Sequence, residues 1–387
     1  MINLFNDKSE CYGCGVCANS CPQNAILMED DKQGFKYPLI NEELCIECGL
    51  CKKVCQINKE SFGKNNRSEF CYGIKASDDI RKVSSSGGIY TVLSDFFLNN
   101  GGVCVGVKYD NKLNSVFCIA TTKTERNEFR GSKYSQGELK DIFILIKKYL
   151  CEKTPVLFVG TPCQVNALKL FLKNGSIDDN ILYTIDLVCH GVASPLVWKQ
   201  YIKHIQDKYE SNIIEFTFRN KLKDWRGYHV FVKLENNNVL TENDCVQSFA
   251  KLYSKNLMLR PSCYNCKYSS LERTGDISIG DFWGIEKIDS SFSDNIGISL
   301  VLVNTEKGEK LFNQNYDKIT LKKYDVDVIN QPNLYEPSKK SVHYNSFWKA
   351  FYKYGYKCVA RKYGGYGKLQ ILYRTRDYLC YKLLKKQ

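Results

Sequence analysis

The sequence predicts a small cysteine-rich α+β unit, followed by an α/β body and a helical basic tail. Three observations predict this order. One cysteine spacing occurs twice within residues 11–55, and two strand–turn–helix units follow each other in residues 154–205. Finally, residues 341–387 interleave basic and aromatic side chains at a helical period.

The amino-terminal unit is defined by eight cysteines in two copies of the spacing C-x2-C-x2-C-x3-C, 34 residues apart. Three thiolates two residues apart can hold one side of an iron–sulfur cube, and the fourth reaches the other cluster. The predicted ligands of the first 4Fe–4S cluster are therefore Cys11, Cys14, Cys17 and Cys55. Those of the second are Cys45, Cys48, Cys51 and Cys21.

Other uses of these cysteines fit less well. Zinc sites favour two paired cysteines in each half of the site, and three at this spacing suit a tetrahedron poorly. Residues 25–40 are predicted to form a hairpin between the halves. Residues 1–60 resemble a bacterial-type two-cluster ferredoxin, with one departure: Gln56 follows Cys55, where the first copy has Pro22.

Length and composition predict a cytoplasmic protein of two to three domains. The 387 residues contain no apolar run of membrane-spanning length, and the first ten residues have neither a basic nor an apolar region of a signal peptide. Thiols stay reduced in the cytoplasm, so the 19 cysteines indicate metal ligation or redox chemistry rather than disulfides.

The first part of the body contains a Ser/Gly-rich stretch, residues 84–88, in front of apolar residues at a helical period: Ile89, Val92, Leu93, Phe96 and Phe97. Such an entry exposes free amides that favour a phosphate, and a plain helix cap is the alternative. Residues 103–110 and 115–122 are predicted to be paired strands around a four-residue turn.

Four further cysteines are candidates for a third site. Cys163 and Cys189 each follow a predicted strand and are expected near a helix amino terminus, where ligands collect in open α/β sheets. Cys263 and Cys266 form a C-x2-C pair. The two pairs together would supply the four ligands of a third 4Fe–4S cluster. The alternative is that the four thiols are unrelated.

Six motifs occur in one order along the body: "SSSGG" (84–88), "GSKYSQG" (131–137), "GTPCQ" (160–164), "LVCHGVASP" (187–195), "SCYNC" (262–266) and "GDISIGDFWG" (275–284). Together they resemble the beta-subunit family of coenzyme F420-reducing hydrogenase and formate dehydrogenase, over about residues 70–330. The resemblance implies an FAD-binding α/β body with an iron–sulfur cluster beside the flavin. The implied domains are 1–60, the FAD-binding part 70–150, the third-cluster part 151–330 and the tail 331–387.

The resemblance also implies roles for individual residues. Contacts to FAD phosphate are expected from Ser85, Ser86, Gly87 and Gly88. Lys133 and Tyr134 are expected along the flavin or its phosphates, and Thr161 and Pro162 are expected to shape the turn that presents Cys163. The candidate catalytic residues are His190, Asp281 and Lys221.

Two of these assignments have plainer alternatives. His190 could transfer protons or only hydrogen-bond a neighbouring carbonyl. The basic cluster Arg219, Lys221 and Arg226 could clamp an anionic substrate or form a solvated loop. The remaining cysteines lack ligand spacing and are expected to be free, mostly buried thiols: Cys71, Cys104, Cys118, Cys151, Cys245, Cys358 and Cys380.

The tail, residues 341–387, carries eleven Lys/Arg and one acid, a net charge of +10. Its aromatic face at helical spacing is Tyr344, Phe347, Trp348, Phe351 and Tyr352. The face could dock on the body or lie on the inner surface of an anionic membrane. Nothing in the tail resembles a nucleic-acid recognition module.

The sequence therefore predicts an iron–sulfur flavoprotein oxidoreductase. Electrons are expected to come from a ferredoxin-type donor or redox partner protein and to pass through the clusters to FAD and an organic substrate. The family suggests polysaccharide biosynthesis as one setting. The alternatives are a coenzyme F420-dependent oxidoreductase and a non-catalytic electron-transfer subunit docked on a partner enzyme. A homo-oligomer is compatible with the sequence.

Overall fold

The computed structural model of the chain describes residues 2–58, 63, 65 and 67–367. The polar stretch at residues 59–69 lies partly outside the described residues. Tail residues 368–387, which include Cys380, lie outside them entirely.

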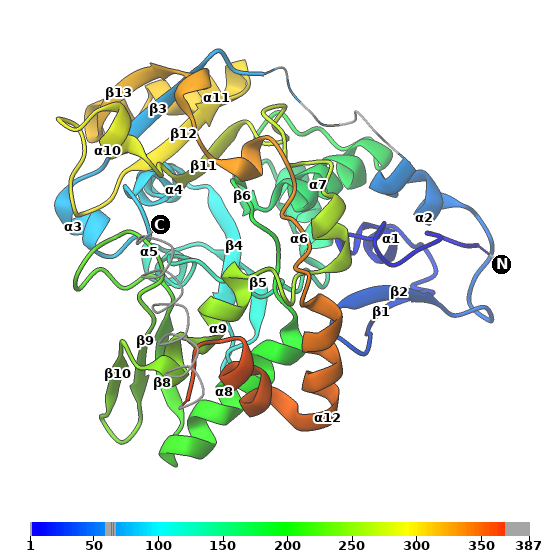
Figure 1. Cartoon of the computed structure of the whole chain (residues 1–387). Coiled ribbons are helices and arrows are strands. Elements are labelled where there is room, and N and C mark those ends of the chain that lie inside the picture. Colours follow the sequence, from blue (N-terminus) through cyan, green and yellow to red (C-terminus); the bar gives the residue numbers. More distant parts are fainter. Residues whose placement is uncertain (1, 59–62, 64, 66, 368–387) are drawn as a thin grey trace, which may run out of the picture.

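The amino-terminal unit has the predicted hairpin, and the third cysteine of each copy lies in a short helix. The hairpin strands are antiparallel, with Ile26 opposite Ile40. The elements of the unit are α1 (Val16–Asn19), β1 (Ile26–Asp30), β2 (Lys36–Ile40), α2 (Leu50–Lys53) and the 3-10 turn η1 (Gln56–Asn58). Gly15 and Gly49 precede the two helices with φ of 64° and 72°, a left-handed conformation that glycine adopts without strain. The unit lies at one side of the molecule (Figure 1).

The body is built on one mixed sheet of eight strands in the order β13-β3-β12-β11-β7-β6-β4-β5. The central strands β4, β6, β7 and β11 are parallel, and antiparallel strands complete both edges. The strands are β3 (Phe70–Lys75), β4 (Val103–Tyr109), β5 (Ser115–Ala120), β6 (Val156–Gly160), β7 (Leu182–Leu187), β11 (Ile277–Asp281), β12 (Ser299–Val303) and β13 (Thr320–Asp325). The predicted pairing of residues 103–110 with 115–122 is confirmed as β4–β5.

Helices cover both faces of this sheet because successive residues of a strand point to opposite sides. On one face, Val103 and Val105 of β4 pack with α6 and α7. On the other, Cys104 packs with α4 and α11. The helices around the sheet are α3 (Asp78–Lys82), α4 (Ile89–Asn99), α5 (Lys123–Asn127), α6 (Ile142–Cys151), α7 (Pro162–Asn174), α10 (Ile285–Ile288) and α11 (Glu306–Asn313).

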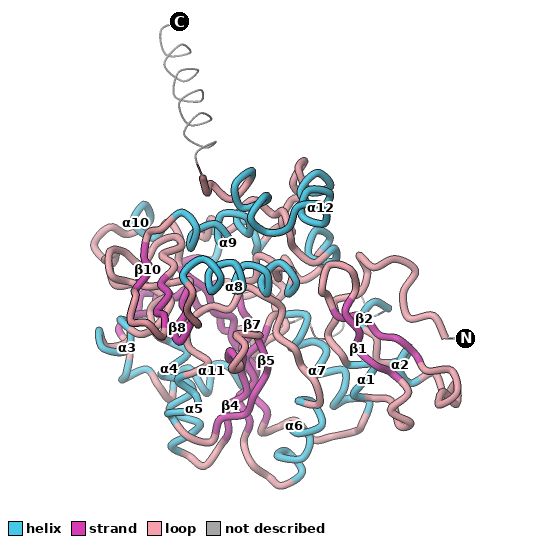
Figure 2. The backbone as a smooth tube through the Cα atoms, turned by 90° about the horizontal axis from the view of Figure 1, so that it is seen from below, coloured by secondary structure: helices cyan, strands magenta, loops and turns pink. Residues whose placement is uncertain are grey.

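A second core forms beside the large sheet, where three helices pack with a small antiparallel sheet of order β10-β9-β8. Figure 2 shows α8, α9 and α12 gathered on one side of the molecule. The elements are α8 (Pro195–Tyr209), β8 (Ile213–Thr217), β9 (Phe231–Leu234), β10 (Val239–Thr241), α9 (Asp244–Ser254) and α12 (Tyr344–Lys362). The remaining 3-10 turns are η2 (Pro261–Asn265), η3 (Tyr316–Lys318), η4 (Val326–Val328) and η5 (Pro332–Leu334).

The described part of the tail docks on the body. Helix α12 contains a kink at Gly355, and its buried aromatic residues belong to the core of α8 and α9. Of the predicted aromatic face, Tyr344, Phe347, Trp348 and Phe351 are buried, whereas Tyr352 is 48% exposed. The face that would have to enter a membrane is thus already covered by protein. No helix among the described residues has the length and apolarity needed to cross a bilayer.

The two predicted parts of the body, 70–150 and 151–330, share the eight-stranded sheet. Strand β3 of the first part lies between β12 and β13 of the second. Neither part can therefore complete its sheet without the other.

Candidate functional site

The structure brings the eight amino-terminal cysteines together in the exchanged pattern that the spacing requires. Burial and then the neighbouring thiolates of Cys14, Cys11 and Cys55 raise the pKa of Cys17. Burial raises the pKa of Cys51, and so do the thiolates of Cys48 and Cys21. The fourth cysteine of each copy thus lies with the first three of the other copy.

The surroundings of these thiols fit an iron–sulfur cluster. Gln56 is 1% exposed, and its Nε2 has no hydrogen-bond partner among the described residues. Burial raises the pKa of Cys14 to about 12, and the Gln56 amide opposes this shift by facing the thiolate. A cluster sulfur beside Cys14 would give this buried amide an acceptor. Gln56, the departure from the ferredoxin pattern, is therefore part of the site.

The spacing of the thiols does not fit a single metal ion. Among the described residues, no group of three or more His, Cys, Asp or Glu side chains is close enough to hold one ion. In a 4Fe–4S cube each thiolate binds a different iron, so the four sulfurs stand further apart than the ligands of one zinc ion.

The second group of cysteines, Cys163, Cys189, Cys263 and Cys266, also converges. Burial and then the Cys266 thiolate raise the pKa of Cys163, and burial followed by the Cys263 and Cys266 thiolates raises that of Cys189. Ser262, next to Cys263, is 1% exposed, and its Oγ lacks a partner among the described residues. Neighbouring thiols with raised pKa values and a buried polar atom without a partner thus occur at this site, as they do at the amino-terminal site.

The two upstream cysteines reach this site in different ways. Cys163 lies in the first turn of α7, where Pro162 opens the helix and the Gln164 side chain accepts from the Thr161 N–H at 2.9 Å. The expectation that Cys189 also lies near a helix amino terminus is wrong. Helix α8 begins only at Pro195, because residues after Cys189 run as an extended loop whose Ala193 bridges to Ser135 and Leu259.

A buried ion pair holds the two halves of this site together. Arg273, which follows the C-x2-C pair, donates to Asp186 Oδ1 at 2.6 Å, and the two side chains are 1% and 0% exposed. Asp186 is near the end of β7, three residues before Cys189, and its Oδ2 accepts from the backbone N–H groups of Thr274 and Gly275 at 2.9 and 2.7 Å. The pair therefore ties the Cys189 loop to the Cys266 loop.

Replacing Arg273 with methionine is expected to lower the free energy of unfolding by about 3–5 kcal/mol, because Asp186 would be left buried without its partner. The measurement is urea unfolding under anaerobic conditions, followed by tryptophan fluorescence. Arg67→Met is the control, since the pair Arg67–Asp327 is at the surface and its loss should cost at most about 1 kcal/mol. Equal effects of the two substitutions would contradict this role of Arg273.

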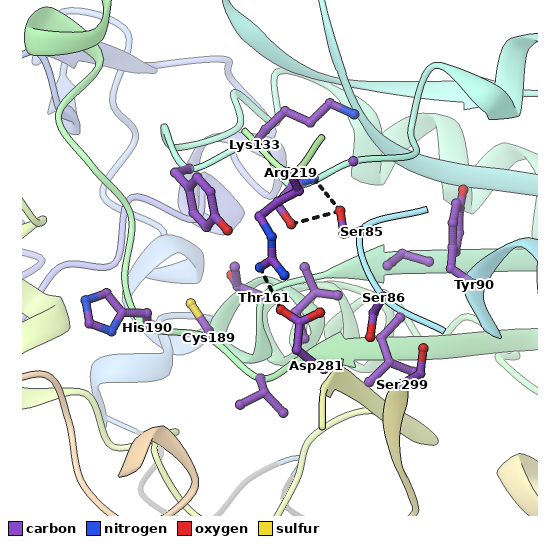
Figure 3. Close-up of a pocket in the computed structure, with 18 of the residues that line it drawn as sticks. Ser85, Ser86, Tyr90, Lys133, Thr161, Cys189, His190, Arg219, Asp281 and Ser299 are labelled. Atoms are coloured by element: carbon purple, nitrogen blue, oxygen red, sulfur yellow. Dashed lines mark hydrogen bonds and ion pairs between the residues drawn. The ribbon is translucent and has the colours of Figure 1, made fainter. Parts of the chain in front are cut away.

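A cavity of about 830 Å³ opens beside Cys189 at the carboxyl ends of the parallel strands (Figure 3). This is the edge at which ligands bind in open α/β sheets. Of the residues expected from the sequence, the cavity is lined by Ser85, Ser86, Gly88, Lys133, Tyr134, Thr161, Cys189, His190, Arg219 and Asp281. Gly87, Pro162 and Lys221 do not line it.

The Ser/Gly-rich stretch reaches the cavity through its serines. The backbone N–H of Ser132 donates to Ser85 Oγ at 3.1 Å, which joins this stretch to the loop that carries Lys133. Gly87 instead packs inward, where a Cβ would lie 2.1 Å from the carbonyl oxygen of Ile74. Gly88 has φ of 87° as the cap of α4. Both glycines are thus required by the fold itself, and replacing them would test folding rather than phosphate binding.

Lys133 projects along the cavity wall. Its ammonium donates to the carbonyl oxygens of Glu128 and Arg130 at 2.8 and 2.7 Å. Burial lowers its pKa to about 7, and the charge of Glu128 opposes this shift. A ligand phosphate would supply the negative charge that the amine lacks.

The opposite wall contains a charged pair among aromatic rings. Arg219 Nη1 donates to Asp281 Oδ2 at 2.7 Å, as Figure 3 shows, and the guanidinium lies 5.0 Å from the Trp283 ring centroid. Tyr134 packs edge-on against Phe218 and Tyr228. The pair and the rings form a flat, partly charged wall of the kind that suits an aromatic ring system with a polar edge.

Lys221 lies behind the cavity. Its ammonium donates to three carbonyl oxygens, those of Arg81, Ser86 and Ile296, at 2.7, 2.6 and 2.7 Å. All three of its donors are occupied, so Lys221 holds the Ser86 segment in place and does not face a ligand. Arg226 lines the cavity, as Arg219 does, and donates to Asp224 and to Ser293 Oγ. Of the predicted basic cluster, only Lys221 is outside the cavity lining.

His190 is at the cavity rim, next to Cys189. Its Nε2 lies 2.6 Å from Asn256 Oδ1, and its Nδ1 lies 3.3 Å from Asn333 Oδ1 and 3.2 Å from Ser338 Oγ. Both ring nitrogens thus have protein partners, which fits a positioned side chain at least as well as a proton carrier.

Sequence reasoning missed two basic residues at these sites. Arg130 lines the cavity and donates to Thr91 Oγ1 at 3.1 Å. Arg130 directly precedes the "GSKYSQG" motif, and this position was the feature of the sequence that could have indicated its place in the cavity. Arg260 contacts Cys11, 249 residues away, and nothing in the local sequence indicates that contact.

Comparisons with known proteins agree with this architecture. Residues 154–327 match the family model for the C terminus of the coenzyme F420 hydrogenase/dehydrogenase beta subunit, and residues 10–58 match the 4Fe-4S dicluster domain. The chain thus carries the C-terminal domain of the F420 hydrogenase/dehydrogenase beta subunit behind a 4Fe-4S dicluster domain. Its amino-terminal unit is a 4Fe–4S-binding domain placed ahead of the family's body.

Two relatives of the chain are oxidoreductase subunits. The F subunit of F(420)H(2) dehydrogenase of Methanosarcina mazei is 22% identical over 329 residues, which cover 80% of this chain and 84% of the relative. The beta subunit of F420-dependent formate dehydrogenase of Methanocaldococcus jannaschii is 26% identical over 250 residues, 62% of this chain and 57% of the relative. A chain of the F420-reducing NiFe hydrogenase complex of Methanosarcina barkeri aligns with a TM-score of 0.46 at 18% identity, over 78% of this chain and 92% of that one.

Proposed function

We propose that the chain is an iron–sulfur flavoprotein oxidoreductase. Two clusters in the amino-terminal unit and a third held by Cys163, Cys189, Cys263 and Cys266 would relay electrons to FAD in the cavity, and FAD would reduce an organic substrate. The observation that carries the proposal is the position of Cys189, which belongs to the second cysteine group and also lines the cavity.

The order of the sites supports a relay. The Cys163 thiol is close enough to Cys14 for the two charges to interact, so the first and third sites are neighbours. Tyr12 and Tyr268 pack edge-on between them, with ring centroids 5.5 Å apart, and both respond to the charge of Cys163. A continuous series of sites thus runs from the amino-terminal unit to the cavity.

Clusters supply one-electron transfer when bound, and a flavin supplies the step from two single electrons to a hydride. The chain's own residues would bind and orient these groups. Ser85, Ser132 and Lys133 provide donors for a phosphate at one end of the cavity. The wall of Arg219, Asp281 and Trp283 would orient a ring at the other, and Lys221 would act only by holding the Ser86 segment.

The test is to measure iron and flavin in anaerobically purified protein. We expect about twelve irons and one non-covalent FAD per chain, because each cluster site can hold four irons. About eight irons would restrict the clusters to the amino-terminal unit. Protein that binds no flavin even after reconstitution would overturn the flavoprotein assignment.

A coenzyme F420-dependent reaction is the second candidate, favoured by the names of the relatives. The two candidate functions differ in the molecule that accepts electrons from the reduced flavin. Flavin reduced in the protein should be reoxidised stoichiometrically by added F420 under the second candidate and should be unaffected by it under the first. A purely electron-transferring subunit needs no open pocket at its flavin, so the open cavity lined by Arg219 supports an enzyme.

A further inference from the structure

Arg260 carries a buried charge between the body and the amino-terminal unit. The residue is 1% exposed, and its backbone N–H donates to the Val192 carbonyl oxygen at 2.9 Å. It forms no ion pair with a carboxylate in the described part of the chain. Burying a guanidinium without a countercharge costs free energy, so the role of Arg260 has to be inferred from its other contacts.

Those contacts are with the first cysteine loop. The guanidinium donates through Nε to the Cys11 carbonyl oxygen at 2.8 Å and through Nη2 to Cys11 Sγ at 3.7 Å. It also donates to the Lys36 carbonyl oxygen at 3.0 Å and to Gln136 Oε1 at 2.9 Å. The Tyr37 ring centroid lies 4.3 Å from its central carbon. The side-chain hydrogen bonds thus reach the loop of Cys11, one ligand of the first cluster, and the charge also acts on Cys263, a ligand of the proposed third site.

The duplicated loops differ at the position where the guanidinium rests. A Cβ on Gly13 would lie 2.6 Å from Arg260 Nη1, so the loop can approach the guanidinium only because this residue is glycine. The corresponding residue of the second copy, 34 residues later, is Glu47. Only the first copy is therefore shaped to receive an arginine.

We propose that Arg260 raises the reduction potential of the cluster held by Cys11, Cys14, Cys17 and Cys55 above that of the cluster held by Cys45, Cys48, Cys51 and Cys21. Reduction adds one negative charge to a cluster that four thiolates already make negative. A buried positive charge and an N–H···S hydrogen bond both stabilise the reduced form. Arg260 would thereby favour electron transfer from the Cys45 cluster to the Cys11 cluster.

The experiment is an EPR-monitored redox titration of the full-length protein and of Arg260→Gln. The midpoint potential of the Cys11 cluster should fall by at least about 59 mV, which is a tenfold less favourable one-electron reduction. The potential of the other amino-terminal cluster should not change. Cys11→Ser, which replaces one thiolate by oxygen, identifies the EPR signal of the Cys11 cluster. Arg260→Lys keeps the charge without the planar fork and should shift the same midpoint by a smaller amount.

Gln33→Leu is the matched control. Gln33 joins the two parts of the chain through Tyr344, with Nε2 donating at 3.0 Å, and within the described residues its side chain hydrogen-bonds to no cysteine. The control should leave both potentials unchanged. An equal shift in Gln33→Leu would mean that docking, not the guanidinium, sets the potential, and unchanged potentials in Arg260→Gln and Arg260→Lys with iron retained would also overturn the proposal. The direction of electron flow rests on the relay proposed above. The titration needs no flavin, so the effect of Arg260 and the flavoprotein assignment can fail separately.

Discussion

Replacing Cys263 with alanine is expected to lower the iron content by about four irons per chain while leaving the amino-terminal clusters in place. The thiol of Cys263 is half-buried in the group formed with Cys163, Cys189 and Cys266, and burial together with the Cys266 thiolate raises its pKa to about 12. A free thiol there would stay protonated, so a metal that binds it would have to displace the proton. Iron and acid-labile sulfide counts, with EPR of the reduced protein, make the measurement.

The same variant should retain flavin but lose electron transfer from the amino-terminal clusters to it. Cys245→Ala is the control, because Cys245 is a buried thiol of the body that packs in the core of α8 and α9. The control should keep all its iron. If Cys263→Ala also keeps its full iron content, the four body cysteines are unrelated thiols and the relay stops at the amino-terminal unit.

Replacing Lys133 with methionine should weaken FAD binding at least tenfold. The substitution keeps the length of the side chain but removes the amine of a residue that lines the cavity. A charge-assisted hydrogen bond to phosphate is worth about 1.5–3 kcal/mol, and tenfold corresponds to about 1.4 kcal/mol. Fluorescence titration of the apo-flavin protein with FAD measures the loss, and the exposed neighbour Lys140→Met is the control, which should bind FAD as the unmodified protein does.

The pH dependence of FAD binding tests the same residue. The pKa of Lys133 is about 7 because burial disfavours its charge, and a bound phosphate would raise that pKa. Below pH 7 the amine is charged in both states, so the affinity should be constant. Above pH 7 only the bound state holds the proton, so the affinity should fall by up to tenfold per pH unit. Lys133→Met should remove this slope, and an unchanged slope would place the phosphate elsewhere.

Local features of the sequence were sufficient for much of the fold. The cysteine duplication, the hairpin between its copies and the strand–helix units around residues 156–174 are encoded over short stretches, and each appears as expected. The docking of the tail also follows from the spacing of Phe347 and Phe351, whose burial shows which face the helix turns to the body.

Features that depend on distant contacts could not be predicted. Lys221 resembled a ligand clamp in sequence, but its three acceptors come from segments at least 75 residues away. Gly87 resembled a phosphate contact, yet the carbonyl oxygen of Ile74 on the neighbouring strand determines its identity. The loop after Cys189 has no helical start because it pairs with two other segments. In each case a contact with a segment distant in the sequence decided the role of the residue.

The contacts of Gln56 have a kinetic consequence. The Tyr268 hydroxyl donates to Gln56 Oε1 at 2.5 Å, Asn166 Nδ2 donates to the same oxygen at 3.2 Å, and the Lys267 ammonium donates to the Gln56 carbonyl oxygen. Three body side chains therefore hold the residue directly after Cys55, and the amino-terminal unit does not have to find its binding site by diffusion. Electron transfer from the amino-terminal unit to the body is therefore expected to be a first-order process. Its rate should be independent of protein concentration and insensitive to salt, unlike transfer by collision between separate carriers.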